Sequence, residues 1–272
     1  MSKIEFTKYS GTGNDFVVID NRAGTIALDN KISWNKICDR KFGVGADGVL
    51  FLNPSDSSEY DYRMVYLNAD GGEVSMCGNG ARCLAHFASF LNIGDGKNYS
   101  FQTMNGSYSA VVEKESVNLK MTEYYDVNRF DISDLFETDH SFFANTGVPH
   151  CVFHCDDLDE LDIVKAGSKV RYDKRFPEGA NANFYKILSE NHIQLRTYER
   201  GVEDETLACG TGAIAAAIAC SKQYGWKGPV QVDMPGGVLQ IPFNEDYSSI
   251  YLGGEVEKIF DGSLILDQFL NS

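Results

Sequence analysis

One nine-residue phrase occurs twice in the chain and decides the fold: Glu73-Val-Ser-Met-Cys77-Gly-Asn-Gly-Ala81 and Glu205-Thr-Leu-Ala-Cys209-Gly-Thr-Gly-Ala213. The two cysteines lie 132 residues apart in a chain of 272, so the offset is close to half the length. Further landmarks precede the cysteines in the same order and at similar spacing: Gly13 and Gly45 in the first half, Gly147 and Gly179 in the second. A repeat this long predicts two related domains, because solenoid repeats recur about every 20–50 residues.

Each copy of the phrase opens a segment that reads as a buried helix. The segment Gly212–Cys220 is apolar on every face, and Ala81–Phe90 is less purely apolar but similar. Because a surface helix carries only an apolar stripe, these two helices should be enclosed. We therefore expect an α+β fold of two pseudo-symmetric domains, each a curled, mostly antiparallel sheet around a central helix, with the active site at the domain junction.

The expected N-terminal domain comprises residues 1–122 and 259–272, and the expected C-terminal domain comprises residues 123–258. A strand around Leu264 to Phe269 is expected to return to the first domain. A helix is expected at Leu158 to Ala166. These boundaries rest on short apolar and β-branched runs between turn residues.

Composition restricts the function classes. The net charge of −15 argues against a nucleic-acid or anionic-membrane partner. The N-terminus lacks the apolar region of a signal peptide, and no apolar run approaches the roughly 18 residues that span a bilayer. Seven cysteines without a CxxC pair fit a reducing cytoplasm.

The repeated cysteines have features that favour chemistry. A thiol at a helix N-terminus lies near the positive end of the helix dipole, which favours the thiolate. The glycines that follow let a ligand approach the backbone, and the amide groups there suit a carboxylate. Two such thiols on opposite sides of one carbon could invert a stereocentre, one removing the α-proton while the other delivers a proton.

The ordinary role of a cysteine is that of a small buried apolar residue. We assign that role to Cys38, Cys83, Cys151, Cys155 and Cys220. Cys77 and Cys209 are the exceptions, because core packing does not require glycines after the cysteine in both copies.

Four phrases together resemble the diaminopimelate epimerase family. They are Gly11-Thr-Gly-Asn-Asp-Phe16, Phe42-Gly-Val-Gly-Ala-Asp-Gly48, the segment from Asn68 to Arg82 and the segment from Tyr198 to Gly212. The resemblance covers essentially the whole chain. It implies interconversion of LL- and meso-2,6-diaminoheptanedioate in lysine and peptidoglycan precursor synthesis, without pyridoxal phosphate or metal. It also implies two pseudo-symmetric domains and a homodimer.

The resemblance also implies roles for individual residues. Cys77 and Cys209 match the acid–base pair, with His150 as the partner of the first and Glu199 as the partner of the second. The residues that match substrate-holding positions are Asn14, Asn68, Asn181 and Arg200. The residues that match backbone donors to the reacting carboxylate are Gly78, Asn79, Gly210 and Thr211.

Two positions depart from the family pattern. Val148 stands where many members have an asparagine that helps to bind the distal end of the substrate, and Gly48 stands where some have glutamine. Neither change touches the proton-transfer residues. Both leave open how the distal group is recognised.

Two other patterns in the sequence suggest different functions. Gly43 to Gly48 satisfies GxGxxG, but it leads into a strand-like run instead of the helix that a dinucleotide site needs. His150, Cys151, His154 and Cys155 alternate between the two faces of a strand, so they cannot converge on one zinc ion. A racemase of another amino acid such as a proline derivative, a dithiol redox protein and an amino-acid-binding module remain alternatives.

Overall fold

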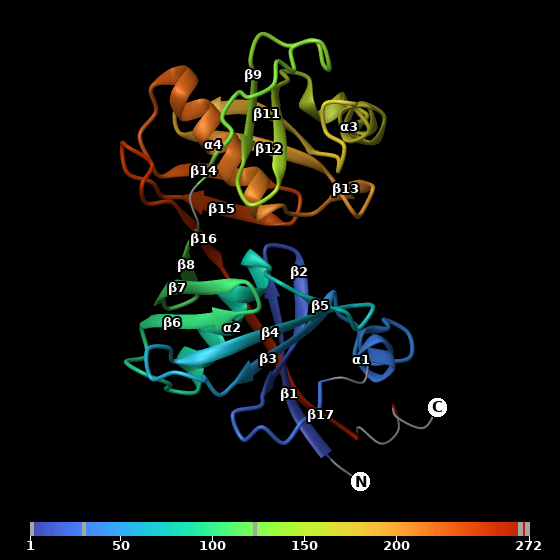
Figure 1. The fold of residues 1–272 in the computed structure, drawn as a ribbon, viewed down its shortest axis with the longest axis vertical. Helices are drawn as coiled ribbons and strands as arrows, with labels where there is room; N and C mark the ends of the chain where they lie inside the picture. The colour runs from blue at the N-terminus through green and yellow to red at the C-terminus, as the bar shows by residue number, and fades with distance from the viewer. Residues whose placement is uncertain (1–2, 29–30, 122–123, 266–268, 270–272) are drawn as a thin grey trace. The chain divides into compact units, whose positions relative to one another are not determined.

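The fold was analysed in a computed structural model (Figure 1), which describes residues 3–28, 31–121, 124–265 and 269. The chain divides into two compact units. The first comprises Met1–Leu119 and Gly254–Ser272, and the second comprises Lys120–Gly253. The two-domain α+β architecture expected from the sequence is confirmed.

The first unit is built from strands that pass from antiparallel to parallel pairing twice. Its elements are β1 (Lys3–Gly11), β2 (Asn14–Asp20), α1 (Lys31–Cys38), β3 (Gly48–Asn53), β4 (Tyr62–Asn68), β5 (Glu73–Val74), α2 (Gly78–Phe90), β6 (Asn98–Thr103), β7 (Gly106–Glu113), β8 (Ser116–Lys120) and β17 (Glu257–Ile265). Strand β2 pairs in parallel with β3, β3 pairs antiparallel with β4, and β4 pairs antiparallel with β5 and in parallel with β6. Strand β6 then pairs antiparallel with β7.

The second unit repeats this order. Its elements are β9 (Ser141–Asn145), β10 (Pro149–His154), the 3₁₀ turn η1 (Leu158–Glu160), α3 (Ile163–Arg171), β11 (Asn181–Ser189), β12 (His192–Glu199), β13 (Asp204–Thr206), α4 (Gly210–Tyr224), β14 (Val230–Met234), β15 (Gly237–Ile241) and β16 (Tyr251–Glu255). Strands β10 and β11 are parallel, β12 is antiparallel to β11 and β13, β12 and β14 are parallel, and β14 and β15 are antiparallel. The internal repeat of the sequence is therefore a repeat of topology.

Each unit encloses one helix, as the apolar segments predict. Helix α2 contacts β1, β2, β3, β4 and β7, and α4 contacts β9 to β12, β14 and β15. Every residue of α4 from Gly212 to Ser221 is buried. Burying an isoleucine such as Ile214 or Ile218 contributes about 1.5–3 kcal/mol. The curled sheet around α4 thus follows from the absence of a polar face on that helix.

The helix expected at Leu158 to Ala166 is wrong. The chain forms η1 there, passes through an extended Leu161, and begins α3 only at Ile163. The Asp162 carboxylate accepts a hydrogen bond from the Lys165 amide at 2.9 Å, which is the N-cap geometry that starts a helix. The cap, rather than the apolar run, therefore sets the start.

The strand that returns to the first unit lies earlier than expected. Strand β17 begins at Glu257 and ends at Ile265, whereas the expected strand ran from Leu264 to Phe269; residues 266–268 lie outside the described part of the chain. Figure 1 shows red β17 beside blue β1, and the two are paired antiparallel along their length. Most side chains of β17 are exposed, so the strand has no apolar alternation by which the sequence could reveal it.

Candidate active site

The two repeated cysteines occupy the N-cap positions of the two enclosed helices. Cys77 precedes α2 with φ −139° and ψ 118°, and Cys209 precedes α4 with φ −128° and ψ 101°. The Gly80 amide donates to Cys77 Sγ at 3.5 Å, and Cys209 Sγ lies 3.6 Å from the Thr211 hydroxyl oxygen. Because the first amides of a helix lack intrahelical acceptors, each sulfur lies beside donors suited to an anion.

In the first unit, two of the predicted substrate-binding asparagines are hydrogen-bonded to each other. Asn79 Nδ2 donates to Asn14 Oδ1 at 2.6 Å. Asn14 Nδ2 in turn donates to Asp47 Oδ2 at 3.1 Å, and the same carboxylate pairs with Arg40 at 2.8 Å. The structure therefore joins the turn between β1 and β2 to the first turn of α2.

Asn68 lies at the exposed end of β4, and its orientation is fixed by a residue that the sequence analysis missed. The Tyr66 hydroxyl donates to Asn68 Oδ1 at 2.8 Å. Burial raises the pKa of Tyr66 well above its usual value, so the phenol remains a neutral donor. The carbonyl side of the Asn68 amide is thus held by the protein.

Tyr66 also explains why position 48 is a glycine. A Cβ atom on Gly48 would lie 2.5 Å from the Tyr66 ring and 2.5 Å from the Leu67 carbonyl oxygen. With this backbone no side chain fits at that position. The space that a glutamine side chain at position 48 would need is occupied by the Tyr66 ring, whose hydroxyl donates to Asn68.

His150 is fully buried on β10 and is held at both ring nitrogens. Asn183 Nδ2 lies 3.0 Å from His150 Nδ1 and also donates to the Cys151 carbonyl oxygen at 3.0 Å. The Thr197 hydroxyl donates to Asn183 Oδ1 at 3.0 Å, which fixes the amide with its nitrogen toward the imidazole. Nδ1 must then accept, and the proton resides on Nε2, which donates to the Thr211 hydroxyl at 3.0 Å.

The electrostatic environment keeps His150 neutral. Burial lowers the pKa of His150 to about 3, and the nearby Arg200 charge acts in the same direction, while the bond from Asn183 opposes them. Within its own unit, the imidazole is connected to Cys209 through the Thr211 hydroxyl. Because burial disfavours the charged form, this imidazole takes up a proton less readily than an ordinary histidine.

Asn183 was not recognised from the sequence, although a signal exists. Asn181 and Asn183 are two residues apart on β11, so their side chains share one face of an otherwise apolar strand. A Cβ atom on Gly212 would lie 2.3 Å from Asn183 Oδ1, so the second glycine of the repeated phrase makes room for this amide. The glycine and the buried asparagine are therefore one structural unit.

Glu199, Asn181 and Arg200 gather where β12 ends. The Thr206 hydroxyl donates to Glu199 Oε2 at 2.9 Å, and burial raises the pKa of Glu199 despite that bond. Asn181 Oδ1 accepts from the Arg200 amide at 2.8 Å, and the Arg200 guanidinium reaches the Glu178 carbonyl oxygen at 3.4 Å. The Glu199 carboxylate therefore gains a proton more readily than that of an ordinary surface glutamate.

Val148 lies in the turn between β9 and β10, where its backbone rather than its side chain is used. The Thr146 amide donates to the Val148 carbonyl oxygen at 3.2 Å, and the Thr146 hydroxyl donates to the Thr211 carbonyl oxygen at 2.9 Å. The turn is therefore attached to the first residues of α4. Position 148 itself supplies no polar side chain.

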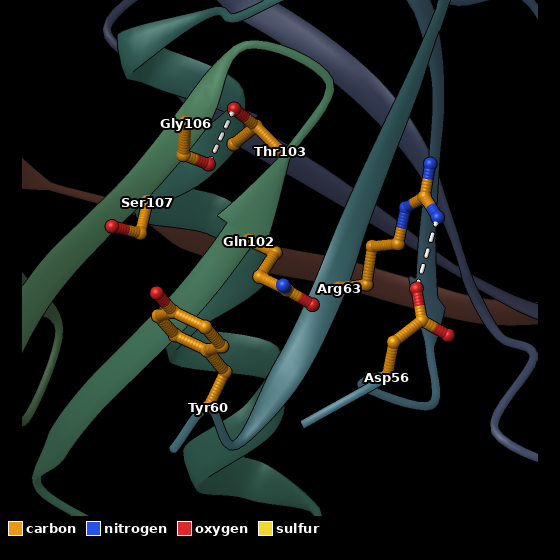
Figure 2. A pocket seen from close by; sticks show the side chains of 7 residues that line it. All are labelled: Asp56, Tyr60, Arg63, Gln102, Thr103, Gly106 and Ser107. Atoms are coloured by element: carbon orange, nitrogen blue, oxygen red, sulfur yellow. Dashed lines mark hydrogen bonds and ion pairs between the residues drawn. The ribbon is translucent and has the colours of Figure 1, made fainter. Parts of the chain in front are cut away.

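A polar hollow of about 390 Å³ in the first unit is separate from these residues (Figure 2). It is lined by Asp56, Tyr60, Arg63, Gln102, Thr103, Gly106 and Ser107. The Arg63–Asp56 pair at its edge is long, at 3.4 Å, and exposed. Such a pair contributes little, and the hollow contains none of the predicted site residues.

The structure also bears on the other functions weighed. Among the described residues, no group of three or more histidine, cysteine, aspartate or glutamate side chains is placed to hold a metal ion. The GxGxxG loop leads into strand β3. No helix in the described ranges is both long and apolar enough to cross a bilayer.

Comparison with known proteins gives a consistent result. The family model described as diaminopimelate epimerase matches residues 6–127 and 142–259. The diaminopimelate epimerase of Flavobacterium psychrophilum is 40% identical over 264 residues, covering 94% of this chain and 98% of the relative. That of Archaeoglobus fulgidus is 39% identical over 285 residues, with 98% of each covered.

Solved structures of low sequence identity share the fold. A phenazine biosynthesis protein of the PhzF family from Bacillus anthracis aligns with a TM-score of 0.73 at 14% identity, covering 97% of this chain and 100% of that one. A hydroxyproline epimerase from Agrobacterium vitis aligns with a TM-score of 0.65 at 16% identity, covering 97% and 93%.

Proposed function

Because the chain belongs to the diaminopimelate epimerase family and is an epimerase of diaminopimelate, we propose that Cys77 and Cys209 are the acid and base of its reaction. The observation that carries the proposal is the repeat: each cysteine caps an enclosed helix in a unit of the same topology. A duplicated thiol beside duplicated donors matches a reaction that needs a proton handled on two faces of one carbon.

The proposed reaction conserves electrons and protons. One thiolate removes the α-proton, and the C–H electron pair becomes a carbanion conjugated with the adjacent carboxylate. The opposite thiol then donates its proton to the other face, which inverts the centre and leaves the two sulfurs with exchanged protonation states. Nothing is oxidised or reduced, so the step calls for no redox cofactor.

The helix N-termini are proposed to stabilise the charge that develops. Backbone amides at Gly78, Asn79, Gly210 and Thr211 would hold the reacting carboxylate. Preorganised amides of this kind favour an anion in a site that excludes water. The glycines after each cysteine leave the backbone accessible to the ligand.

His150 and Glu199 are proposed as the groups that exchange protons with the thiols, His150 with Cys77 and Glu199 with Cys209. For His150 the support is the family resemblance, because burial lowers its pKa and makes the resting imidazole a weaker base than an ordinary histidine. The raised pKa of Glu199 lets its carboxyl group both hold and return one. Both properties arise from burial in this structure.

The non-reacting end of the substrate carries an ammonium and a carboxylate. We propose that Asn14, Asn68, Asn181 and Arg200 bind it, because amides recognise both groups and a guanidinium matches a carboxylate. Tyr66 supports this set through Asn68. Shorter α-amino acids, which lack the distal groups, should therefore be poor substrates.

We also propose that the protein acts as a homodimer in the cytoplasm, in lysine and peptidoglycan precursor synthesis. The family resemblance and the seven cysteines without a CxxC pair support this proposal. Light scattering after size-exclusion chromatography measures the assembly. A purely monomeric, fully active protein would contradict the homodimer.

Exchange of the α-hydrogen in heavy water tests the two-thiol proposal. Reduced wild-type protein should exchange it and epimerise diaminopimelate, whereas Cys77→Ala and Cys209→Ala should each lose epimerisation by about 10²–10⁴-fold or more. Cys220→Ala is the matched control, since Cys220 lies in α4 and burial raises the pKa of its thiol to about 12. An active Cys77→Ala or Cys209→Ala protein would end the proposal.

A further inference from the structure

A fully buried arginine lies one turn into the first enclosed helix. The Arg82 side chain has no exposed surface, and its Nη2 donates to Asn79 Oδ1 at 2.7 Å and to Thr12 Oγ1 at 2.8 Å. Its Nη1 donates to the Glu255 carbonyl oxygen at 3.3 Å. Within the described part of the chain these acceptors are uncharged, so a guanidinium is buried without a carboxylate partner. Burying a charge in this way destabilises the folded state, so we expect the Arg82 side chain to have a role in the site.

The contacts of Arg82 set the direction of a chain of amides. A guanidinium only donates, so Asn79 must turn its oxygen toward Arg82 and its nitrogen away. The nitrogen then donates to Asn14 Oδ1 at 2.6 Å, and Asn14 must direct its own nitrogen to Asp47 Oδ2, at 3.1 Å. Reversing either amide would place two donors or two acceptors face to face. Arg82 at one end and Asp47 at the other thus fix the orientation of both asparagines, and Arg82 acts directly on Asn79.

Arg82 also holds the turn that presents Asn14. Thr12 has φ +50°, a backbone conformation that β-branched residues rarely adopt, and Gly13 follows with φ +82°. The turn packs closely on α2, because a Cβ atom on Gly11 would lie 2.9 Å from Cys83 Sγ. The bond from Arg82 to the Thr12 hydroxyl therefore ties a strained turn to the helix that begins after Cys77.

We propose that Arg82 is a positioning residue for substrate: it fixes the amides of Asn14 and Asn79, and its buried charge favours the anionic group bound at the start of α2. This inference rests on the proposed roles of those two asparagines. Arg82 itself need not touch the substrate. Its charge lies in a low-dielectric interior, where it acts more strongly than a surface charge.

Substrate binding tests the inference. In the inactive Cys209→Ala background, calorimetry with meso-diaminopimelate gives Kd directly, and in the otherwise wild-type protein steady-state assays give KM and kcat separately. Arg82→Met should raise Kd and KM by about 10–100-fold, the range for losing charge-assisted hydrogen bonds. Thr12→Val, which removes one acceptor and leaves the bond to Asn79, should give a smaller rise.

Two further variants separate positioning from general destabilisation. Phe101→Leu weakens the core of the same unit, where the Phe101 ring stacks on Tyr62 and Tyr108, and it should leave Kd unchanged. Arg82→Lys keeps the charge but loses the planar fork, whose second nitrogen reaches the Glu255 carbonyl oxygen, and it should fall between wild type and Arg82→Met. If Arg82→Met fails to fold, the Kd of Arg82→Lys tests the positioning role in its place.

The outcomes distinguish this inference from the proposed function. Wild-type Kd values in both Arg82→Lys and Thr12→Val would overturn the positioning role while leaving the two-thiol reaction intact. A wild-type protein that does not exchange the α-hydrogen would instead overturn the proposed function. Weaker binding in the Arg82 variants together with an unchanged Phe101→Leu protein supports the inference.

Discussion

Mild acid should destabilise the second unit through His150. An ordinary histidine has a pKa of 6.5, and burial lowers that of His150 to about 3. Below pH 6.5 the unfolded chain therefore binds a proton that the folded chain refuses, so stability is complete above that pH and is lost as pH falls toward 3. Linkage gives a loss of up to about 1.4 kcal/mol per pH unit, or about 2 kcal/mol between pH 7 and pH 5.

The measurement uses the position of the two tryptophans. Trp34 belongs to the first unit and Trp226 to the second, so a Trp34→Phe background leaves a fluorescence reporter for the second unit alone. Urea unfolding under reducing conditions gives the free energy of unfolding of this protein and of its His150→Gln derivative at pH 7 and pH 5. The change between the two pH values, compared between the two proteins, is the contribution of His150. The loss of hydrogen bonds affects His150→Gln at both pH values and cancels in the comparison.

The expected difference in pH dependence is about 2 kcal/mol. His140→Gln serves as the control, because that imidazole is half-buried and the pKa is also lowered by burial, so its contribution should be smaller. Parallel losses in the wild-type and His150→Gln proteins would refute the reasoning. They would mean that His150 is charged or hydrated in the folded state.

Three other substitutions have defined outcomes. Gly48→Ala should destabilise the first unit by about 1–3 kcal/mol in urea unfolding, because the new Cβ would meet the Leu67 carbonyl oxygen at 2.5 Å; an unchanged stability would contradict this packing. Asn183→Leu should cost about 1–3 kcal/mol and slow epimerisation, since a buried imidazole nitrogen loses its donor; unchanged kinetics would remove Asn183 from the site. The raised pKa of Glu199 means that its carboxylate is protonated at a higher pH than an ordinary glutamate, so the wild-type rate should fall at that higher pH as acid is added. The pH–rate profile of Glu199→Gln should lack this fall.

The sequence predicted the elements whose pattern is local. Helices α2 and α4 were predictable because their own side chains are mostly apolar. Their N-caps were predictable because the repeated phrase places glycines after the cysteine. The roles assigned to the cysteines and asparagines stay predictions, since they concern a ligand.

What the sequence could not reveal depends on contacts between distant segments. The bond between Asn183 and His150 joins two strands whose parallel register only the fold defines. Arg82 reads in the sequence as an ordinary helical residue, and only the packing of the Thr12 turn shows where its guanidinium points. Likewise, Tyr66 explains Gly48 only once β3 and β4 are side by side.

The pairing of β1 with β17 has a consequence for biosynthesis. Lys3 is opposite Ile265, and the Thr7 hydroxyl donates to Asp261 at 2.8 Å, so β1 must wait during translation for β17, which follows the whole second unit. Leu264 also completes the core that contains Ile4 and Phe6. The second unit, whose residues are contiguous, has all its partners earlier. We therefore expect the second unit to reach its native state before the first, with one edge of β1 left open until β17 has been made.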